Sequence, residues 1–220
     1  MTNETKAVIF DMDGLLIDSE IIWYQLYQDL LEPYGGGFSV EDYAQNYSGK
    51  IAIENLTAIV DRFQLPITPQ EGLKRVFGWE QKYLDRGVDL KAGAKELLTY
   101  LKENQYKIAL ATSSGKERAM NILTKNQVDF YFDEMVFGPE VKRGKPFPDV
   151  FLQAAEKLGE KPENCLVLED SEAGIQAAHA AGIPVICVPD MKQPGEKYVE
   201  MTTDMVHSLF DIIEYLKKEL

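Results

Sequence analysis

Two carboxylates stand two positions apart, directly after a short apolar run near the start of the chain. Residues 7–10 (Ala-Val-Ile-Phe) are typical of a buried strand, and Asp11, Asp13 and Gly14 follow it. In an open α/β sheet, ligands bind just beyond the carboxyl ends of the strands. Packing gives no reason to place aspartates there, so the pattern favours a site for a hard cation or a nucleophile. An EF-hand calcium loop is excluded, because the glycine is the fourth residue of this segment and not the sixth.

Three more predicted strands end in polar residues that suit phosphate or a metal ion. These residues are Thr112-Ser113-Ser114 after residues 107–111, Lys145-Pro146 shortly after Phe137, and Glu169-Asp170-Ser171 after residues 165–168. If the sheet is parallel, all four strand ends lie on one edge of it. The sequence therefore predicts that these polar residues converge on one crevice.

The chemistry that such a crevice supports is phosphoryl transfer. Mg²⁺ is held by carboxylates together with phosphate and water, and Asp11 and Asp170 are the candidate carboxylates. Thr112 and the amides after it are candidates for holding phosphate oxygens, and Lys145 for neutralising charge at phosphorus. Asp11 is the candidate nucleophile, which would form an aspartyl-phosphate. Asp13 is the candidate general acid to the leaving alcohol and then general base to water.

Other roles compete for some of these residues. The hydroxyls of Thr112-Ser113-Ser114 precede a predicted helix at Lys116, and we expect them to cap it as well. Capping of the next helix by Asp170 or Ser171 competes with metal binding at that segment. Histidine does not compete for the acid/base role. His179 lies within a predicted helix and His207 opens the last one, away from the four strand ends.

The segment after the first motif is helical. Its predicted helices cover residues 18–34, 51–63 and 69–84, and one more begins after Ser39, an N-cap with Asp42 at the third helical position. No convincing strand stands between residues 18 and 89. The aromatic residues of this block are expected to form its own core: Trp23, Tyr24, Tyr27 and Trp79.

From Leu90 onward, strands alternate with helices. The predicted strands cover residues 106–111, 134–137, 165–168 and 185–188, and the predicted helices cover residues 94–104, 116–126, 148–158, 173–181 and 207–218. This alternation predicts the α/β class, with a Rossmann-like parallel sheet and helices on both faces. We expect this core to comprise residues 1–17 and 89–220, with residues 18–88 inserted as an all-helical cap domain.

Composition narrows the class of partner. The 220 residues are long enough to bury a sizeable core, and the net charge of −13 leaves no basic footprint for nucleic acid. Cys165 and Cys187 lie in apolar runs and are expected to be buried thiols, not a disulfide. The polar N-terminus resembles no signal peptide, and no apolar run is long enough for a membrane span. We expect a cytoplasmic protein, a monomer with a dimer as the alternative.

The four motifs together resemble the haloacid dehalogenase superfamily of phosphatases and phosphomutases. The resemblance is to the branch with a helical cap after the first strand, which includes beta-phosphoglucomutase and many sugar phosphatases. It covers essentially the whole chain, and its motifs are residues 10–19, Thr112, Lys145-Pro146, and Glu169-Asp170-Ser171 with Ala173-Gly174 following. Four motifs in order and at strand ends are far more specific than one.

The resemblance implies a role for each acidic residue. Asp11 would be nucleophile and metal ligand, and Asp13 would be the acid/base, with its backbone carbonyl also on the metal. Asp170 would bind Mg²⁺ directly, and Glu169 either directly or through water.

The resemblance also implies which residues hold the transferring phosphate and the substrate. Thr112, Ser113 and Lys145 would hold the phosphate, and Gly14 lies in the mobile turn next to it. Lys50 stands in a loop between two cap helices, where this branch places a specificity residue. We expect Lys50 to contact the anionic or hydroxyl-rich end of the substrate.

Departures from the family patterns separate its members. Asp13 speaks against a dehalogenase, which has no second aspartate there. Beta-phosphoglucomutase carries a cap histidine and an arginine in the specificity loop, where this chain has Trp23 and Ala52. A phosphonate-cleaving relative needs a cap lysine that forms a Schiff base, and only Lys50 leaves that open.

We therefore expect a Mg²⁺-dependent phosphatase that hydrolyses a small phosphorylated metabolite, a sugar phosphate or a nucleoside-monophosphate-like compound, through an aspartyl-phosphate. A phosphomutase is the alternative. A non-catalytic phosphometabolite-binding protein is the third reading. The set of Asp11, Asp13, Lys145 and Asp170 argues against it, because binding alone needs no paired nucleophile and base.

Overall fold

The computed structural model describes residues 4–219 of the chain. The chain divides into two compact units. The α/β unit comprises the described residues up to Asp18 and from Asp89 onward, and the helical unit comprises Ser19–Val88. Both connections between the units therefore fall where the first strand has ended and before the second begins.

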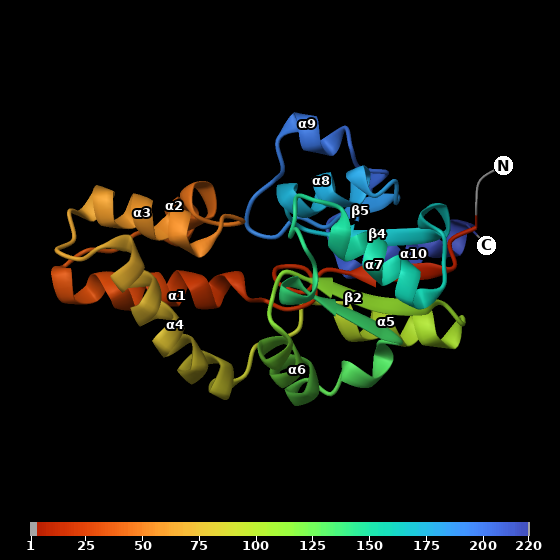
Figure 1. The fold of residues 1–220 in the computed structure, drawn as a ribbon, viewed down its shortest axis with the longest axis horizontal. Coiled ribbons are helices and arrows are strands. Elements are labelled where there is room, and N and C mark those ends of the chain that lie inside the picture. The colour runs from red at the N-terminus through yellow and green to blue at the C-terminus, as the bar shows by residue number, and fades with distance from the viewer. Residues whose placement is uncertain (1–3, 220) are drawn as a thin grey trace. The chain divides into compact units, whose positions relative to one another are not determined.

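The α/β unit is built on one parallel sheet, in the order β3-β2-β1-β4-β5-β6 (Figure 1). The strands are β1 (Ala7–Phe10), β2 (Lys107–Thr112), β3 (Glu134–Phe137), β4 (Cys165–Glu169), β5 (Val185–Cys187) and β6 (Asp204–Met205). Every residue of β1 is fully buried, as expected for a central strand covered on both faces. Phe10 stands opposite Leu110 of β2 and Leu168 of β4, so the carboxyl ends of these strands lie level.

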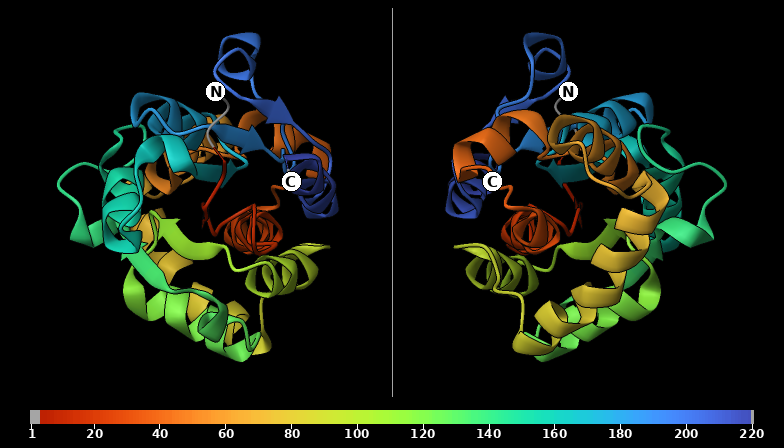
Figure 2. Two further views of the ribbon diagram at one scale, coloured as in Figure 1. Left: turned by 90° about the vertical axis from the view of Figure 1, so that its right-hand side faces the viewer. Right: turned by 90° about the vertical axis from the view of Figure 1, so that its left-hand side faces the viewer.

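Helices cover both faces of this sheet (Figures 1 and 2). They are α5 (Ala94–Glu103), α6 (Lys116–Lys125), α7 (Asp149–Leu158), α8 (Glu172–Ala180), α9 (Glu196–Val199) and α10 (Leu209–Glu219), with 3-10 turns η2 (Asp129–Tyr131), η3 (Gly138–Glu140) and η4 (Pro162–Asn164). One face carries alternate strand residues such as Ile9, Ala109 and Val167, which pack with Phe151 of α7 and Ile175 of α8. This alternation decides which side chains at the strand ends share a face.

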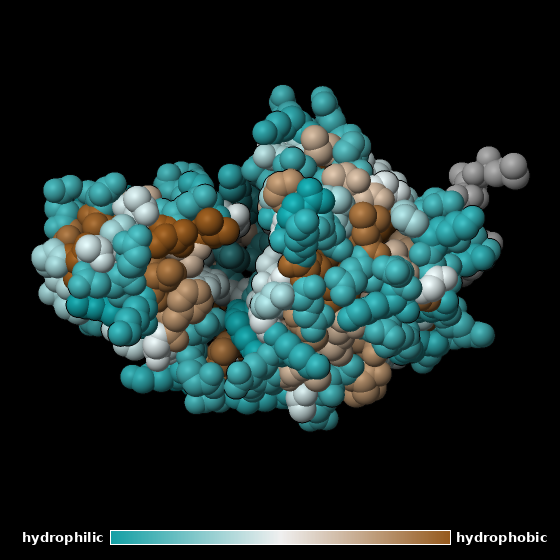
Figure 3. Space-filling model, viewed as in Figure 1, coloured by the Kyte–Doolittle hydropathy of each residue, from teal (hydrophilic) through white to brown (hydrophobic). Residues whose placement is uncertain are grey.

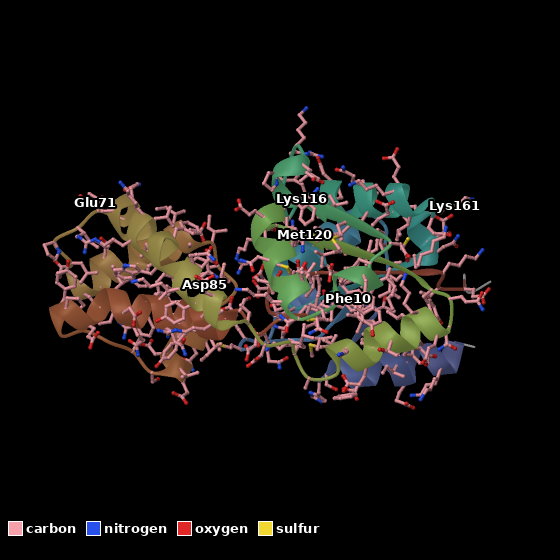
Figure 4. The ribbon with its side chains drawn as sticks, turned by 90° about the horizontal axis from the view of Figure 1, so that it is seen from below. Phe10, Glu71, Asp85, Lys116, Met120 and Lys161 are labelled. Atoms are coloured by element: carbon pink, nitrogen blue, oxygen red, sulfur yellow. The ribbon has the colours of Figure 1, made fainter. Side chains whose placement is uncertain are left out.

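The helical unit comprises α1 (Glu20–Leu31), η1 (Glu32–Tyr34), α2 (Val40–Asn46), α3 (Ala52–Phe63) and α4 (Pro69–Arg86). Ser39 caps α2 by accepting a hydrogen bond from the Asp42 amide at 3.2 Å, as predicted. Thr68 and Glu71 form a capping box at the start of α4, where Figure 4 labels Glu71. Tyr27 and Tyr43 are buried in the core of this unit, and their rings lie 6.3 Å apart.

The predicted α/β class is confirmed, and most element boundaries differ from the prediction by one or two residues. Strand β6 and helix α9 were not predicted, because elements of two and four residues are too short to show a hydrophobic period. His207 precedes the last helix, which begins at Leu209 and not at His207.

Cys165 and Cys187 are buried free thiols, as predicted. None of the described helices is long and apolar enough to cross a membrane, and the face of the molecule shown in Figure 3 is mostly hydrophilic.

Phe151 anchors α7 against the sheet, and its side chain is fully buried. We expect Phe151→Ala to lower the free energy of unfolding by about 3–5 kcal/mol, because it leaves a cavity in the core. Urea denaturation followed by circular dichroism measures this loss. Phe130→Ala is the control, since Phe130 is 67% exposed and should cost less than about 1.5 kcal/mol. Equal losses in the two variants would contradict the packing described for α7.

Candidate active site

The site is built where the order of the strands reverses. The chain runs from β1 outward to β2 and β3 and then returns to β4 on the other side of β1 (Figure 1). Such a switch point leaves a crevice beyond the strand ends. The Asp11 amide donates to the Leu168 carbonyl at 3.1 Å, and the register places Asp11 level with Glu169. The two carboxylates therefore face the same side of the sheet.

Lys145 lies between these two carboxylates. Its Nζ donates to Asp11 Oδ1 and, at 2.6 Å, to Glu169 Oε1. The exposed fractions of the Lys145, Asp11 and Glu169 side chains are 7%, 9% and 0%. Nζ also lies 4.8 Å from the centre of the Phe151 ring, a cation–π contact. Burial by itself disfavours the ammonium, but the two carboxylates outweigh it, so the pKa of Lys145 lies above its usual value.

One ammonium does not balance the charge of this cluster. Burial is the largest cause that raises the pKa of Asp11, to about 7, and the nearby Glu169 carboxylate also raises it. The Lys145 ammonium acts in the opposite direction and lowers this pKa. Asp170 adds a third carboxylate. One oxygen each of Asp11, Glu169 and Asp170 lies within 4.8 Å of the others. Opposite ligands of Mg²⁺ stand about 4.2 Å apart, so this donor set fits a small divalent cation after a slight contraction.

Glu169 also holds the turn that carries Asp170. Its Oε2 accepts hydrogen bonds from the amides of Asp170 and Ser171, both at 2.9 Å, and from Ser171 Oγ at 3.0 Å. Ser171 Oγ in turn accepts from the Gly174 amide at 3.1 Å and caps α8. Of the two predicted caps for this helix, Ser171 is the one that the structure shows as the N-cap.

Gly14 lets the chain turn close to Asp170. Its φ is +85°, and a Cβ at this position would lie 2.2 Å from Asp170 Oδ2. The Gly14 amide donates to the Ile17 carbonyl at 3.1 Å, which closes the turn after β1. A side chain at Gly14 would thus displace the carboxylate that follows β4.

The hydroxyl segment after β2 reaches the same edge of the sheet. Thr112 is the last residue of β2 and is buried, and its Oγ1 accepts from the Ser114 amide at 3.0 Å. Ser113 is exposed at this end of the strand. The predicted capping of the next helix by these hydroxyls is wrong. Gly115, which has no side chain to cap with, is the N-cap of α6, and the Thr112 hydroxyl bonds within its own turn.

Asp13 meets two residues to which the sequence analysis gave no role. Ser114 Oγ donates to Asp13 Oδ2 at 2.8 Å, and Arg118 Nη1 donates to the same oxygen at 3.0 Å. Ser114 belongs to the predicted hydroxyl segment, whereas Arg118 lies outside all four sequence motifs. Their four-residue spacing across the start of a predicted helix was the one available signal, because such residues face each other.

Lys50 belongs to the helical unit, so the structure does not place it against the residues above. It lies in the loop between α2 and α3, and its Nζ donates to the Asn46 carbonyl at 2.7 Å. His179 and His207 are exposed and belong to α8 and to the segment before α10.

The sequence and the fold of this chain are similar to those of known proteins. The family model described as haloacid dehalogenase-like hydrolase matches residues 8–188. A phosphorylated carbohydrates phosphatase of Thermotoga maritima is 35% identical over 178 residues, which cover 81% of this chain and 82% of that protein. A Drosophila melanogaster protein assigned as a pseudouridine-5′-phosphatase is 36% identical over 210 residues, 92% of this chain and 89% of its own. A solved Thermotoga maritima structure, assigned as a beta-phosphoglucomutase, is 32% identical with a TM-score of 0.82 and covers 98% of this chain and 100% of its own.

The fold is that of an α/β Rossmann-like protein, which the solved structure shares. The chain belongs to the haloacid dehalogenase-like hydrolase family. The resemblance predicted from the four motifs is thus confirmed. The class of enzyme predicted, a phosphoric monoester hydrolase, is confirmed too, since the curated relatives named above are phosphatases.

Gly174 tests how tightly the Glu169 carboxylate is held. A Cβ at Gly174 would lie 1.8 Å from the Glu169 carboxyl carbon, so we expect Gly174→Ala to displace Glu169. The free energy of unfolding should fall by about 1–3 kcal/mol, as for overpacked cores. Urea denaturation measures the change.

Gly78→Ala is the matched control, because among the described residues no atom lies within 4 Å of a Cβ at Gly78 in the helix α4. This variant should gain about 0.5–1 kcal/mol. A Gly174→Ala protein as stable as the wild type would contradict the close approach of α8 to Glu169.

Proposed function

We propose that this protein is a Mg²⁺-dependent phosphatase that hydrolyses a small phosphorylated sugar or nucleoside-like metabolite through an aspartyl-phosphate. One observation carries the proposal: the buried group of Asp11, Lys145 and Glu169, with Asp170 beside it, at the switch point of the sheet. Buried charges of this kind are costly, and no packing need explains three carboxylates there.

Asp11 is the nucleophile in this proposal. It directly follows β1, the central strand, so its backbone is fixed by the sheet, and Lys145 orients its Oδ1. The other carboxylate oxygen, Oδ2, attacks phosphorus, and the bond from phosphorus to the leaving alcohol breaks. The resulting aspartyl-phosphate is then hydrolysed by water. Lys145, buried and charged, stabilises the negative charge on the phosphoryl oxygens during both steps.

Asp13 moves the proton in this proposal. Its side chain is 30% exposed, compared with 9% for Asp11, and it lies two residues after Asp11 at the same end of β1. It protonates the leaving alcohol and then takes a proton from the attacking water. Thr112, Ser113 and the amides that follow β2 hold the phosphoryl oxygens.

Asp11 and Asp170, with the Asp13 carbonyl, are the residues proposed to hold Mg²⁺. A bound ion would supply positive charge that offsets the repulsion between these carboxylates and the phosphate. Glu169, whose two oxygens accept hydrogen bonds from Lys145 and the 170–171 turn, is proposed to act on the ion either directly or through water.

The substrate class comes from the relatives, whose names point to phosphorylated carbohydrates and to pseudouridine 5′-phosphate. The net charge of −13 repels an anionic substrate on average, so local positive charge has to attract it. Lys50, in the helical unit, is the residue proposed to supply part of that charge.

Replacing the nucleophile tests the mechanism. Asp11→Asn should lower phosphate release from a panel of phosphorylated metabolites by about 10³-fold or more, because an amide cannot form the intermediate. Asp129→Asn, in the 3-10 turn η2 that precedes β3, is the matched control and should keep wild-type activity. An Asp11→Asn protein as active as the wild type would sink the proposal. A wild type that releases no phosphate from any substrate would instead favour a binding protein.

Metal removal tests the cofactor. Treatment with EDTA should abolish phosphate release, and added Mg²⁺ should restore it, because the carboxylates otherwise repel the incoming phosphate. Full activity in EDTA would refute the Mg²⁺ dependence but leave Asp11 as the nucleophile.

The phosphate-release assay also separates the phosphomutase alternative. Interconversion of beta-glucose 1-phosphate and glucose 6-phosphate, with little free phosphate, would favour a mutase such as the one assigned in Thermotoga maritima.

Lys50→Ala tests the proposed specificity residue. We expect KM to rise about tenfold for the preferred sugar phosphate, with a smaller change for substrates without a second polar end, because the lost contact binds that end. Initial rates over the same panel measure the profile. Lys74→Ala, an exposed lysine on α4, is the control. An unchanged profile in Lys50→Ala would remove Lys50 from the site.

A further inference from the structure

We infer that Arg118 and Ser114 together position the carboxyl group of Asp13 for proton transfer. Arg118 contacts Asp13 directly and also contacts Ser114. This inference rests on the proposed function, in which Asp13 is the acid/base. Arg118 is a positioning residue in this account, since it touches Asp13 and not the reacting atoms. All three residues belong to the α/β unit.

The geometry separates the two oxygens of Asp13. Oδ2 accepts two hydrogen bonds, from Ser114 Oγ at 2.8 Å and from Arg118 Nη1 at 3.0 Å. Oδ1 lies 2.9 Å from Arg118 Nη1 but not in a hydrogen-bonding direction. Within the described part of the chain, Oδ1 is buried and accepts no hydrogen bond. One oxygen is therefore fixed, and the other is left for a proton.

A triangle of contacts makes this arrangement rigid. Arg118 Nη1 also donates to Ser114 Oγ at 2.9 Å. The Ser114 hydroxyl therefore accepts a hydrogen bond from Arg118 and donates one to Asp13. The Ser114 amide is tied to Thr112 Oγ1, which links the triangle to the end of β2. Asp13 lies 105 residues from Arg118 in the sequence, so only the folded sheet brings the two together.

Helix α6 supplies the rigid support. Arg118 lies in the first turn of α6, between Lys116 and Met120, which Figure 4 labels. The side chain is only 19% exposed, so its rotamers are restricted. A guanidinium stays charged and donates along fixed directions, which an ammonium does not. A general acid or base works only when the oxygen that carries the proton is aimed at the reacting atom. Holding Oδ2 in place fixes the orientation of the whole carboxyl group, and therefore the direction of Oδ1.

The experiment compares leaving groups, because only a poor leaving group needs a proton. 4-Nitrophenolate leaves without one, whereas a sugar alkoxide does not. For Arg118→Met, we expect kcat/KM to fall about tenfold or more with an alkyl sugar phosphate and less than about threefold with 4-nitrophenyl phosphate. Ser114→Ala should show the same split with a smaller loss, and Arg118→Lys should regain part of the activity on the alkyl ester.

Lys102→Met is the matched control, since Lys102 also pairs with an aspartate, Asp133 at 2.5 Å, on the exposed surface of the same unit. It should leave both values of kcat/KM unchanged. A second measurement places Arg118→Met in the Asp13→Asn background. If Arg118 acts through Asp13, the double variant should be no slower than Asp13→Asn alone, within about twofold.

The outcomes are distinct. Equal losses on both esters, or losses that multiply in the double variant, would overturn the inference and assign Arg118 a structural or phosphate-binding role. In both cases the wild type remains a phosphatase. A wild type that hydrolyses neither ester would instead refute the proposed function, and the inference with it.

Discussion

A single ammonium group between two buried carboxylates organises the end of the sheet. Lys145 donates to Asp11 and to Glu169, and all three side chains are nearly removed from water. Charges in such a place are tolerated only when they are paired, and removing one partner leaves the others uncompensated. The remaining hydrogen bonds follow from this pairing. Glu169, held by Lys145 on one oxygen, uses its other oxygen to shape the turn that presents Asp170.

The topology of the sheet makes this pairing possible. Asp11 leaves the central strand and Glu169 ends its neighbour β4, so the two carboxylates are adjacent although 158 residues of chain separate them. Parallel strands place all their carboxyl ends on one edge, so β2 brings Thr112, its last residue, to this edge, and the segment after β3 brings Lys145 to it. The carboxylates repel each other, but the hydrogen-bonded strands β1 and β4 hold the backbone of Asp11 and of Glu169 in place. The excess negative charge that remains is what a divalent cation would offset.

Much of this architecture was predictable from local patterns. Short apolar runs identified five of the six described strands, four of them followed by polar residues, and helical spacing identified the helices between them. Elements without a pattern were missed, namely β6 and α9. Capping was predicted correctly at Ser39, whose Oγ accepts a hydrogen bond from the Asp42 amide. It failed at the segment after β2, where Thr112 bonds within its own turn and a glycine occupies the N-cap.

The sequence by itself determined the kind of chemistry, because residue types and strand periodicity are local properties that the chain carries in any conformation. Paired aspartates, a hydroxyl segment, a lysine and an acidic pair, each at a strand end, already indicated phosphoryl transfer. Tertiary structure decided which atoms meet. The two donors on Asp13 Oδ2 come from Ser114 and Arg118, more than 100 residues away, and Glu169 proved to be held through both of its oxygens. Hydrogen bonds depend on distance and angle to within a fraction of an ångström, and only the register of the sheet and the position of α6 fix these.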